Sequence, residues 1–191
     1  SVGRASGLAK AVGRIAHWLH RNTRKHARDN VAAHYDLGND FYGSWLDATM
    51  TYSSAVFGHL PPAGEALETA QKRKIGLILD RTQMKAGDRL LEIGCGWGGL
   101  AEAALDRAPI AYHGISLSPE QIRFAEARLA GRGDWNITLT DYRDVIGQYD
   151  AIASVEMVEA VGQEYWPAYL DCIARCLKPG GRAALQYIRI E

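Results

Sequence analysis

The sequence predicts an α/β protein built on a doubly wound, mostly parallel sheet. From Asp88 onward, short apolar runs alternate with amphipathic helical segments. A glycine-rich run, "EIGCGWGG", joins the first of these apolar runs to a helix, so the backbone can turn tightly there and approach a ligand. In such sheets, ligands bind at the carboxyl ends of the strands.

The periodicity of the apolar residues predicts the elements in order. Steps of three and four predict helices over 5–28 and 65–84, and Asn39 or Asp40 is expected to cap a short aromatic helix between them. The expected strands are 89–94, 110–116, 136–140, 150–155 and 181–188. The expected helices between the strands lie near 98–107, 118–131 and 164–177.

The composition fits one globular core. The 191 residues are 47% hydrophobic, and the net charge of +0 argues against a general nucleic-acid binder. Three cysteines without a disulfide spacing favour a reducing compartment. Neither a membrane span nor a secretory signal is seen, so we expect a cytoplasmic protein. Because residues 1–30 are basic, their helix either lies on an anionic membrane surface or is simply solvated.

Breaks in the pattern suggest two parts. Pro61, Pro62 and Gly64 separate a helical segment, 1–64, which we expect to cover the active site, from a ligand-binding domain, 65–191. Only five strands are predicted, so we expect the C-terminal strands of the sheet to be missing and these residues alone to show weak turnover or none.

The glycine turn is not typical of a dinucleotide-binding site. Gly94, Gly96 and Gly99 satisfy GxGxxG, but that match alone is weak. Ser116 stands where a dinucleotide enzyme carries its ribose-binding acid. Glu92 inside the strand, "DYRD" after the third strand and "LKPGG" before the fifth instead resemble the class I S-adenosylmethionine-dependent methyltransferases.

Longer blocks narrow the resemblance. "HYDLGNDFYGSWLD", "MTYSSAVF", "EIGCGWGG", "LSPEQ", "DYRD" and "SVEMVEAVG" occur in this order. They resemble the cyclopropane fatty-acid synthase family, which includes mycolic-acid cyclopropane and methyl-branching enzymes. The resemblance implies S-adenosyl-L-methionine as cofactor. The residues that it places around this cofactor are Tyr52, Ser53, Glu92, Gly94, Cys95, Gly96, Trp97, Gly98, Ser116, Gln121, Asp141, Tyr142 and Arg143.

The same resemblance implies a second set of residues for catalysis. Glu159 corresponds to an acidic residue that helps to hold a bicarbonate ion in relatives, and Glu156 competes for that role on spacing alone. Ser54 and Gln186 replace a cysteine and a histidine that are common in relatives, which puts ring formation in doubt. Ile188 completes the implied site, and His34 is either a further member or a helix-start hydrogen-bonding group.

The implied reaction is methyl or methylene transfer to the cis double bond of unsaturated phospholipid acyl chains, which forms cyclopropane fatty acids. Alternatives are a methyl-branched or methylene product, a methyltransferase for a soluble small molecule, and a non-catalytic binding module. Aromatic residues such as Trp45 and Tyr187 would tolerate a carbocation, or are simply core. The expected partners are lipid acyl chains and a peripheral membrane surface at the inner face, and a homodimer is compatible with the sequence.

Overall fold

The computed structural model describes residues 38–60, 62 and 64–189. The expected helix over 5–28 therefore lies outside the described residues, and so does His34.

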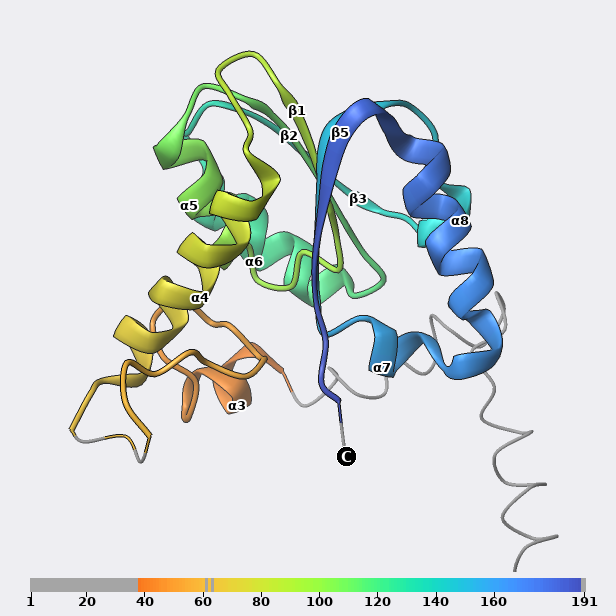
Figure 1. Cartoon of the computed structure of the whole chain (residues 1–191). Coiled ribbons are helices and arrows are strands. Elements are labelled where there is room, and N and C mark those ends of the chain that lie inside the picture. Colours follow the sequence, from red (N-terminus) through yellow and green to blue (C-terminus); the bar gives the residue numbers. More distant parts are fainter. Residues whose placement is uncertain (1–37, 61, 63, 190–191) are drawn as a thin grey trace, which may run out of the picture.

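Within the described residues the chain forms a five-stranded parallel sheet (Figure 1). The order of its strands is β3-β2-β1-β4-β5. Their bounds are Arg89–Ile93 (β1), Ala111–Ser116 (β2), Asp134–Leu139 (β3), Tyr149–Val155 (β4) and Leu177–Gln186 (β5). The direction of winding reverses between β1 and β4, and such a switch point opens a crevice at the carboxyl ends of these two strands.

Helices cover both faces of the sheet (Figure 1). One hydrophobic cluster joins the sheet to α4 (Leu67–Thr82), α5 (Gly99–Arg107) and α6 (Pro119–Leu129). A second cluster, on the opposite face, joins it to α8 (Trp166–Cys176) and the short 3-10 helix η1 (Tyr142–Asp144). The remaining short elements are α3 (Asn39–Gly43), α7 (Val158–Val161) and η2 (Gln163–Tyr165).

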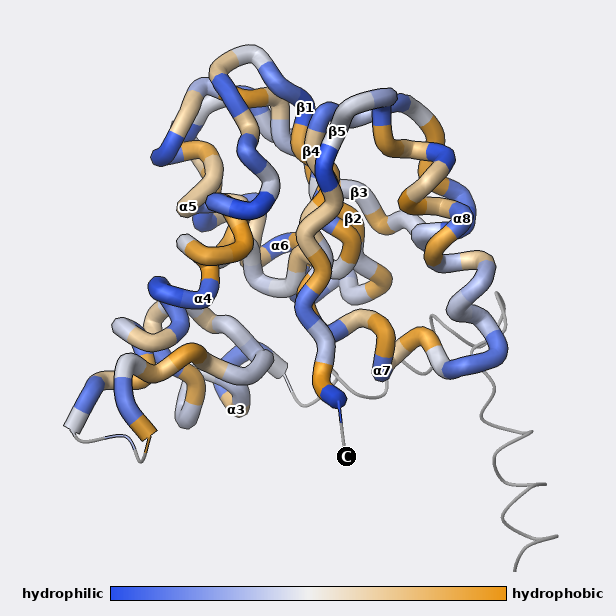
Figure 2. Tube along the Cα trace, viewed as in Figure 1, coloured by the Kyte–Doolittle hydropathy of each residue, from blue (hydrophilic) through white to orange (hydrophobic). Residues whose placement is uncertain are grey.

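Strand geometry explains why two cores form. Side chains alternate between the faces of a strand, so Leu90 and Ala151 face the α4 side while their neighbours Leu91 and Ile152 face α8. All four side chains are fully buried. Hydrophobic residues follow the central strands in Figure 2, as a parallel sheet covered on both faces requires. This arrangement confirms the Rossmann-like fold of the class I methyltransferases.

Three local expectations differ from the structure. β5 begins at Leu177, so "LKPGG" belongs to the strand; a Cβ at Gly181 would lie 2.7 Å from the Asp150 carbonyl oxygen, which is why this segment can approach β4 closely. Gly38, not Asn39 or Asp40, is the N-cap of α3. Leu77 is 37% exposed, although the steps of three and four that predict the helix over 65–84 place it with the apolar residues.

The cysteines of α8 and the character of the helices can also be compared with the expectations. Cys172 and Cys176 are buried on α8, where they pack into the second core. Of the helices that the structure describes, none combines the length and the apolar character needed to cross a membrane.

Candidate functional site

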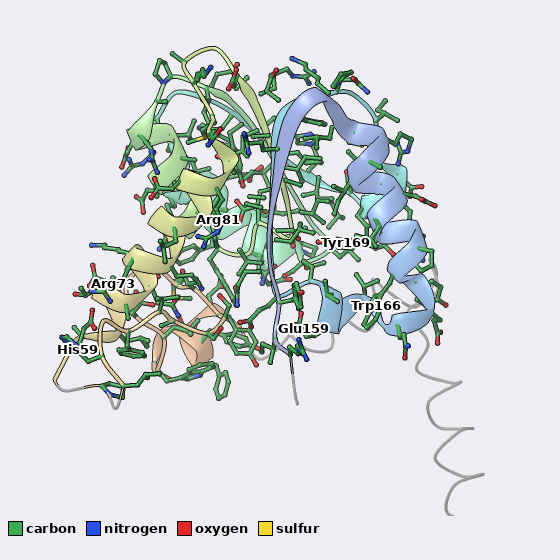
Figure 3. The ribbon with its side chains drawn as sticks, viewed as in Figure 1. His59, Arg73, Arg81, Glu159, Trp166 and Tyr169 are labelled. Atoms are coloured by element: carbon green, nitrogen blue, oxygen red, sulfur yellow. The ribbon has the colours of Figure 1, made fainter. Side chains whose placement is uncertain are left out.

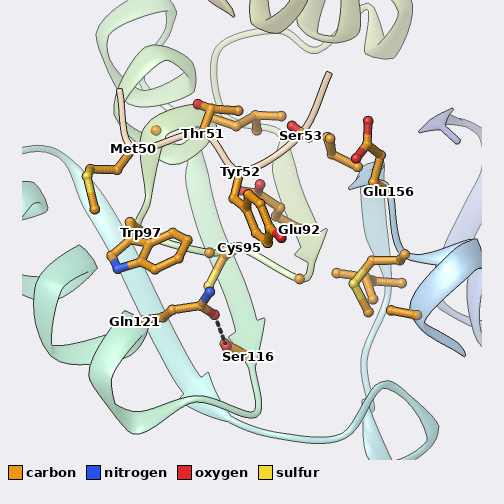
Figure 4. Close-up of a pocket in the computed structure, with 18 of the residues that line it drawn as sticks. Met50, Thr51, Tyr52, Ser53, Glu92, Cys95, Trp97, Ser116, Gln121 and Glu156 are labelled. Carbon is orange, nitrogen blue, oxygen red and sulfur yellow. Dashed lines mark hydrogen bonds between the residues drawn. The ribbon is translucent and has the colours of Figure 1, made fainter. Parts of the chain in front are cut away.

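A cavity of about 850 Å³ opens at the carboxyl ends of β1, β2 and β4 (Figure 4). Its walls come from the glycine turn after β1, the segment 50–54, helix α4 and the residues that follow β4. The expected residues that line it are Tyr52, Ser53, Ser54, Glu92, Gly94, Cys95, Gly96, Trp97, Ser116, Gln121, Tyr142, Glu159 and Ile188. The fold therefore brings most of the predicted site into one cavity.

The glycine turn forms the floor of this cavity. Gly94 and Gly96 have φ values of 82° and 52°, a region that favours glycine. A Cβ at Gly94 would lie 2.5 Å from the sulfur of Met157, whereas a Cβ at Gly96 would meet nothing within 4 Å. Gly96 thus leaves open space at the cavity wall, while Gly94 allows the β4 side to pack closely against the turn.

Glu92 lies behind the turn and is almost completely buried. Its carboxyl group accepts a hydrogen bond from the Tyr112 hydroxyl at 2.6 Å. Desolvation raises the pKa of Glu92 to about 8, although the hydrogen bond from Tyr112 and the charge of Lys74 oppose the shift. A cationic ligand in the cavity would favour the charged form of Glu92.

The end of β2 carries a polar pair. Ser116 Oγ donates to Gln121 Oε1 at 2.9 Å, and both side chains are buried at the start of α6 (Figure 4). Ser118 caps this helix by accepting from the Gln121 backbone N–H. Their mutual hydrogen bond fixes both polar groups at this end of the cavity.

The end of β3 is only partly in the cavity. Tyr142 lines it, whereas Asp141 and Arg143 are not among the lining residues. Arg143 donates through its backbone N–H at 2.9 Å and its guanidinium at 2.6 Å to the Asp141 carboxylate. Gly98, the N-cap of α5, also lies outside the lining; a Cβ there would lie 3.1 Å from the Cβ of Ala125 on α6.

Aromatic rings form the wall opposite the β4 side (Figure 4). Tyr42 lies between Tyr52 and Trp97, with ring centroids 5.5 Å and 5.0 Å away. Trp45 stands edge-on to Tyr52 at 5.5 Å. Trp97 Nε1 donates to Asn39 Oδ1 at 2.7 Å, which ties the turn to α3 and explains why Asn39 is not the N-cap. Tyr42 packs behind this wall, and like Phe41 and Tyr187 it does not line the cavity itself.

Two polar residues of α4, neither of which was expected in the site from the sequence, also line the cavity. Gln71 Nε2 donates to the Ser53 carbonyl at 2.7 Å, and its buried Oε1 has no hydrogen-bond partner among the described residues. Lys74, 2% exposed, donates to Ser53 Oγ. Burial lowers the pKa of Lys74 to about 8. Polar side chains at core-facing helix positions were the signal that could have identified them.

The residues expected around an anion are divided between two carboxylates. Ser54 and Gln186 both donate to Glu156, at 2.6 Å and 2.8 Å, although Gln186 is not a lining residue. Glu159 is exposed on α7 (Figure 3) and accepts from the Ile188 backbone N–H instead. No hydrogen bond joins Glu159 to Ser54 or Gln186 in the part of the chain that the structure describes.

Comparisons with known proteins show which family this chain resembles. Residues 22–191 match the family model described as "Mycolic acid cyclopropane synthetase". The chain is 43% identical over 202 residues to the tuberculostearic acid methyltransferase UfaA1 of Mycobacterium tuberculosis, covering 96% of this chain and 47% of that protein. It is 42% identical over 148 residues to the cyclopropane-fatty-acyl-phospholipid synthase of Escherichia coli, covering 78% of this chain and 37% of that protein.

A solved structure shows the same fold. The mycolic acid cyclopropane synthase CmaA1, complexed with SAH and CTAB, superposes with a TM-score of 0.74 at 31% identity. The match covers 79% of this chain and 53% of that one. The chain thus spans about half, or less, of the length of the relatives it matches.

Proposed function

Because the chain belongs to the mycolic acid cyclopropane synthetase family, we propose that it transfers a methyl group from S-adenosylmethionine to the cis double bond of an unsaturated acyl chain. The observation that carries the proposal is a single cavity with two different walls. The glycine turn, with open space at Gly96, forms the floor, and the ring of Tyr52 and the carboxylate of Glu156 lie on the two opposite walls above it.

The residues of the cavity fit the cofactor. Gly96 offers room against the backbone, and the unpartnered Gln71 Oε1 can accept a hydrogen bond from a bound ligand. When bound, S-adenosylmethionine supplies an electrophilic methyl group on a cationic sulfur. We assign its binding to the turn residues, to Tyr52 and Ser53, to the Ser116–Gln121 pair and to Tyr142, with Asp141, Arg143 and Gly98 supporting them from behind.

The chemistry of the acceptor explains the aromatic wall. An alkene is a weak nucleophile, so its π electrons form the new C–C bond while a positive charge develops on the neighbouring carbon. The faces of Tyr52, Trp45 and Trp97 can stabilise such a charge by about 2 kcal/mol when water is excluded. Burial also raises the pKa of the Cys95 thiol, so this side chain stays neutral and contributes an apolar surface.

A base must then take a proton, and besides the buried Glu92 two carboxylates, Glu156 and Glu159, line the cavity. Glu159, next to the Ile188 N–H, is the counterpart of the residue expected to hold bicarbonate. Glu156 lies closer to β4 and is held by Ser54 and Gln186. Removal of a proton from the transferred methyl closes a cyclopropane ring, or leaves a methylene branch if a hydride shifts first.

The remaining assignments follow from the same proposal. Phospholipid acyl chains are the proposed acceptors, because the E. coli relative is named for them. A methyl-branched product is the second candidate, favoured by the identity of 43% to a tuberculostearic acid methyltransferase and by Ser54 and Gln186 in place of the cysteine and histidine common in relatives. We further propose a cytoplasmic enzyme that acts at the inner membrane face, with homodimerisation as an accompanying proposal.

Mass spectrometry of lipids tests the proposed function. We expect cells that express the full-length protein to convert part of their monounsaturated phospholipid chains to species that are one methylene group heavier. Gas chromatography then separates the ring from the branched isomer. An unchanged fatty-acid profile, with methylation of soluble metabolites instead, would support the small-molecule alternative and reject the lipid one.

A further inference from the structure

Glu156 is held at the end of β4 in an unusual conformation. Its φ of 49° is positive, a region that non-glycine residues adopt at an energetic cost and that clusters at functional sites. Its backbone N–H donates to the Gln186 carbonyl at 2.7 Å, which anchors the residue to β5. The surrounding structure therefore holds this side chain at the cavity wall (Figure 4).

Three donors from distant parts of the chain converge on one oxygen of Glu156. The Ser54 backbone N–H at 2.8 Å, Ser54 Oγ at 2.6 Å and Gln186 Nε2 at 2.8 Å all donate to Oε1. Gln186 Nε2 also donates to Ser54 Oγ at 3.0 Å. Among the described residues, no donor reaches Oε2. One oxygen is thus fixed while the other is available to a substrate.

In this arrangement Ser54 and Gln186 have a different role from the one that the resemblance implied. The resemblance to known enzymes implied that these two positions line a site for a small oxyanion next to Glu159. In the structure they hold the side-chain carboxylate of Glu156, and Glu159 binds the Ile188 N–H instead. A carboxylate has the planar shape and the charge of bicarbonate, so the two groups would compete for the same donors.

Hydrogen-bond donors around Glu156, together with the cation of Lys74, favour its ionised form. Desolvation alone would raise its pKa, but the hydrogen bonds from Ser54 and Gln186 and the charge of Lys74 outweigh it, and the pKa is lowered. Lys74 is buried nearby and donates to Ser53 Oγ. The carboxylate is therefore present at neutral pH without a bound ion to assist it.

We propose that Glu156 is a built-in base that replaces a diffusible oxyanion such as bicarbonate in this enzyme. This inference rests on the proposed function. As the alkene forms its bond to the methyl carbon, the methyl–sulfur bond breaks and leaves a carbocation on the acyl chain. Glu156 Oε2 takes a proton from the transferred methyl. The C–H electron pair then forms either the ring bond or, after a hydride shift, the double bond of a methylene branch.

A weakly basic carboxylate is sufficient for this step. A proton next to a carbocation is strongly acidic, so the base needs correct placement and a negative charge more than a high proton affinity. Ser54 and Gln186 provide that placement by fixing Oε1. The proposal also gives a reason for the strained backbone at Glu156, since a relaxed φ would alter the direction in which the side chain leaves β4.

Three variants of the full-length protein test the proposal in buffer freed of carbon dioxide. Glu156→Gln keeps the shape of the side chain and removes the charge. Glu156→Gly suits the positive φ and leaves space for an added anion. Glu126→Gln, on the exposed side of α6, is the matched control for loss of one carboxylate. Product formation is followed by mass spectrometry, and binding of ¹³C-bicarbonate by NMR in the presence of S-adenosylhomocysteine.

The expected results separate Glu156 from a bound ion. Wild type and Glu126→Gln turn over without bicarbonate, and Glu156→Gln loses about 100-fold or more in product formation. Glu156→Gly is equally slow, binds ¹³C-bicarbonate, and regains about tenfold or more when bicarbonate is added, whereas wild type binds none. Retained thermal unfolding shows that each variant is folded.

Other results would overturn the proposal. These are a wild-type enzyme that needs bicarbonate and binds it, or a Glu156→Gln variant as active as the control. If wild type methylates no lipid under any condition, the proposed function fails. The bicarbonate titration then still decides whether Glu156 fills the anion site, because wild type and Glu156→Gly must differ in binding.

Discussion

At the scale of single residues, Glu92 should make ligand binding in the cavity depend on pH. It is buried, its described hydrogen-bond donor is the Tyr112 hydroxyl, and burial raises its pKa to about 8. At pH 7 the carboxyl is therefore mostly protonated in the free protein. A cationic cofactor stabilises the carboxylate, so binding should release a proton below pH 8 and none well above it.

Isothermal titration calorimetry in buffers of different ionisation enthalpy checks this prediction. At pH 7 we expect S-adenosylmethionine binding to release a fraction of a proton, and affinity to rise with pH until about pH 8. Glu92→Gln should abolish most of the release. Lys74 titrates in the same range, so Lys74→Gln is the comparison, and the release should persist in it. Heats at pH 7 that do not depend on the buffer would refute the assignment.

At the scale of elements, the turn between β1 and α5 shapes the floor of the proposed cofactor site. Gly96 has a positive φ and open space where a side chain would begin, whereas Gly94 packs against Met157. Gly131, after α6, has a φ of 79° and also meets nothing within 4 Å, but it does not line the cavity. A side chain at Gly96 or at Gly131 would therefore carry a similar conformational cost, but only Gly96 lies at the cavity.

This pair gives a matched test of the turn. Gly96→Ala and Gly131→Ala should each lower the free energy of unfolding by about 1–2 kcal/mol, because alanine disfavours positive φ. Only Gly96→Ala should weaken S-adenosylmethionine binding, by about tenfold or more, since its methyl group would occupy the open space. Urea unfolding and calorimetry measure the two effects. Equal affinities in both variants would show that the space at Gly96 is not used.

Most of the elements were predictable because their signals are local. The almost continuous buried run of β4 and the helical spacing of α4 appear directly in the order of apolar residues. The sequence places the start of β5 later because "LKPGG" is typical of a turn. The structure counts this segment in β5, but with a register shift opposite Tyr149 and Ala151 and a φ of 80° at Gly180. The N-cap of α3 was predicted one or two residues late because Trp97, 58 residues away, binds the Asn39 side chain.

The candidate site was predictable where its residues follow strand ends. Glu92, Gly96, Ser116 and Tyr142 all reach the cavity because the carboxyl ends of parallel strands meet at one edge of the sheet. The role of Glu156 was not predictable, since its partners Ser54 and Gln186 are 102 and 30 residues away along the chain. Spacing alone could not choose between Glu156 and Glu159.

At the scale of the whole molecule, the fold brings three parts of the chain to one cavity. In the proposed function, the strand ends hold the cofactor, the segment 50–54 closes over it, and Glu156 faces it from β4. Lys74 and Gln71 of α4 fasten Ser53 to this wall, so the cover and the sheet form one continuous surface. The central claim is that this cavity transfers a methyl group to an acyl chain and then removes a proton from that same methyl.

The most direct test of this claim is the deuterium content of the product. The full-length protein is incubated with S-adenosylmethionine carrying a fully deuterated methyl group and with a phospholipid that contains a cis double bond. The account predicts that the modified acyl chain retains two of the three deuterium atoms, because one leaves as the proton taken by the base. A chain with all three deuterium atoms, or with none, would contradict it.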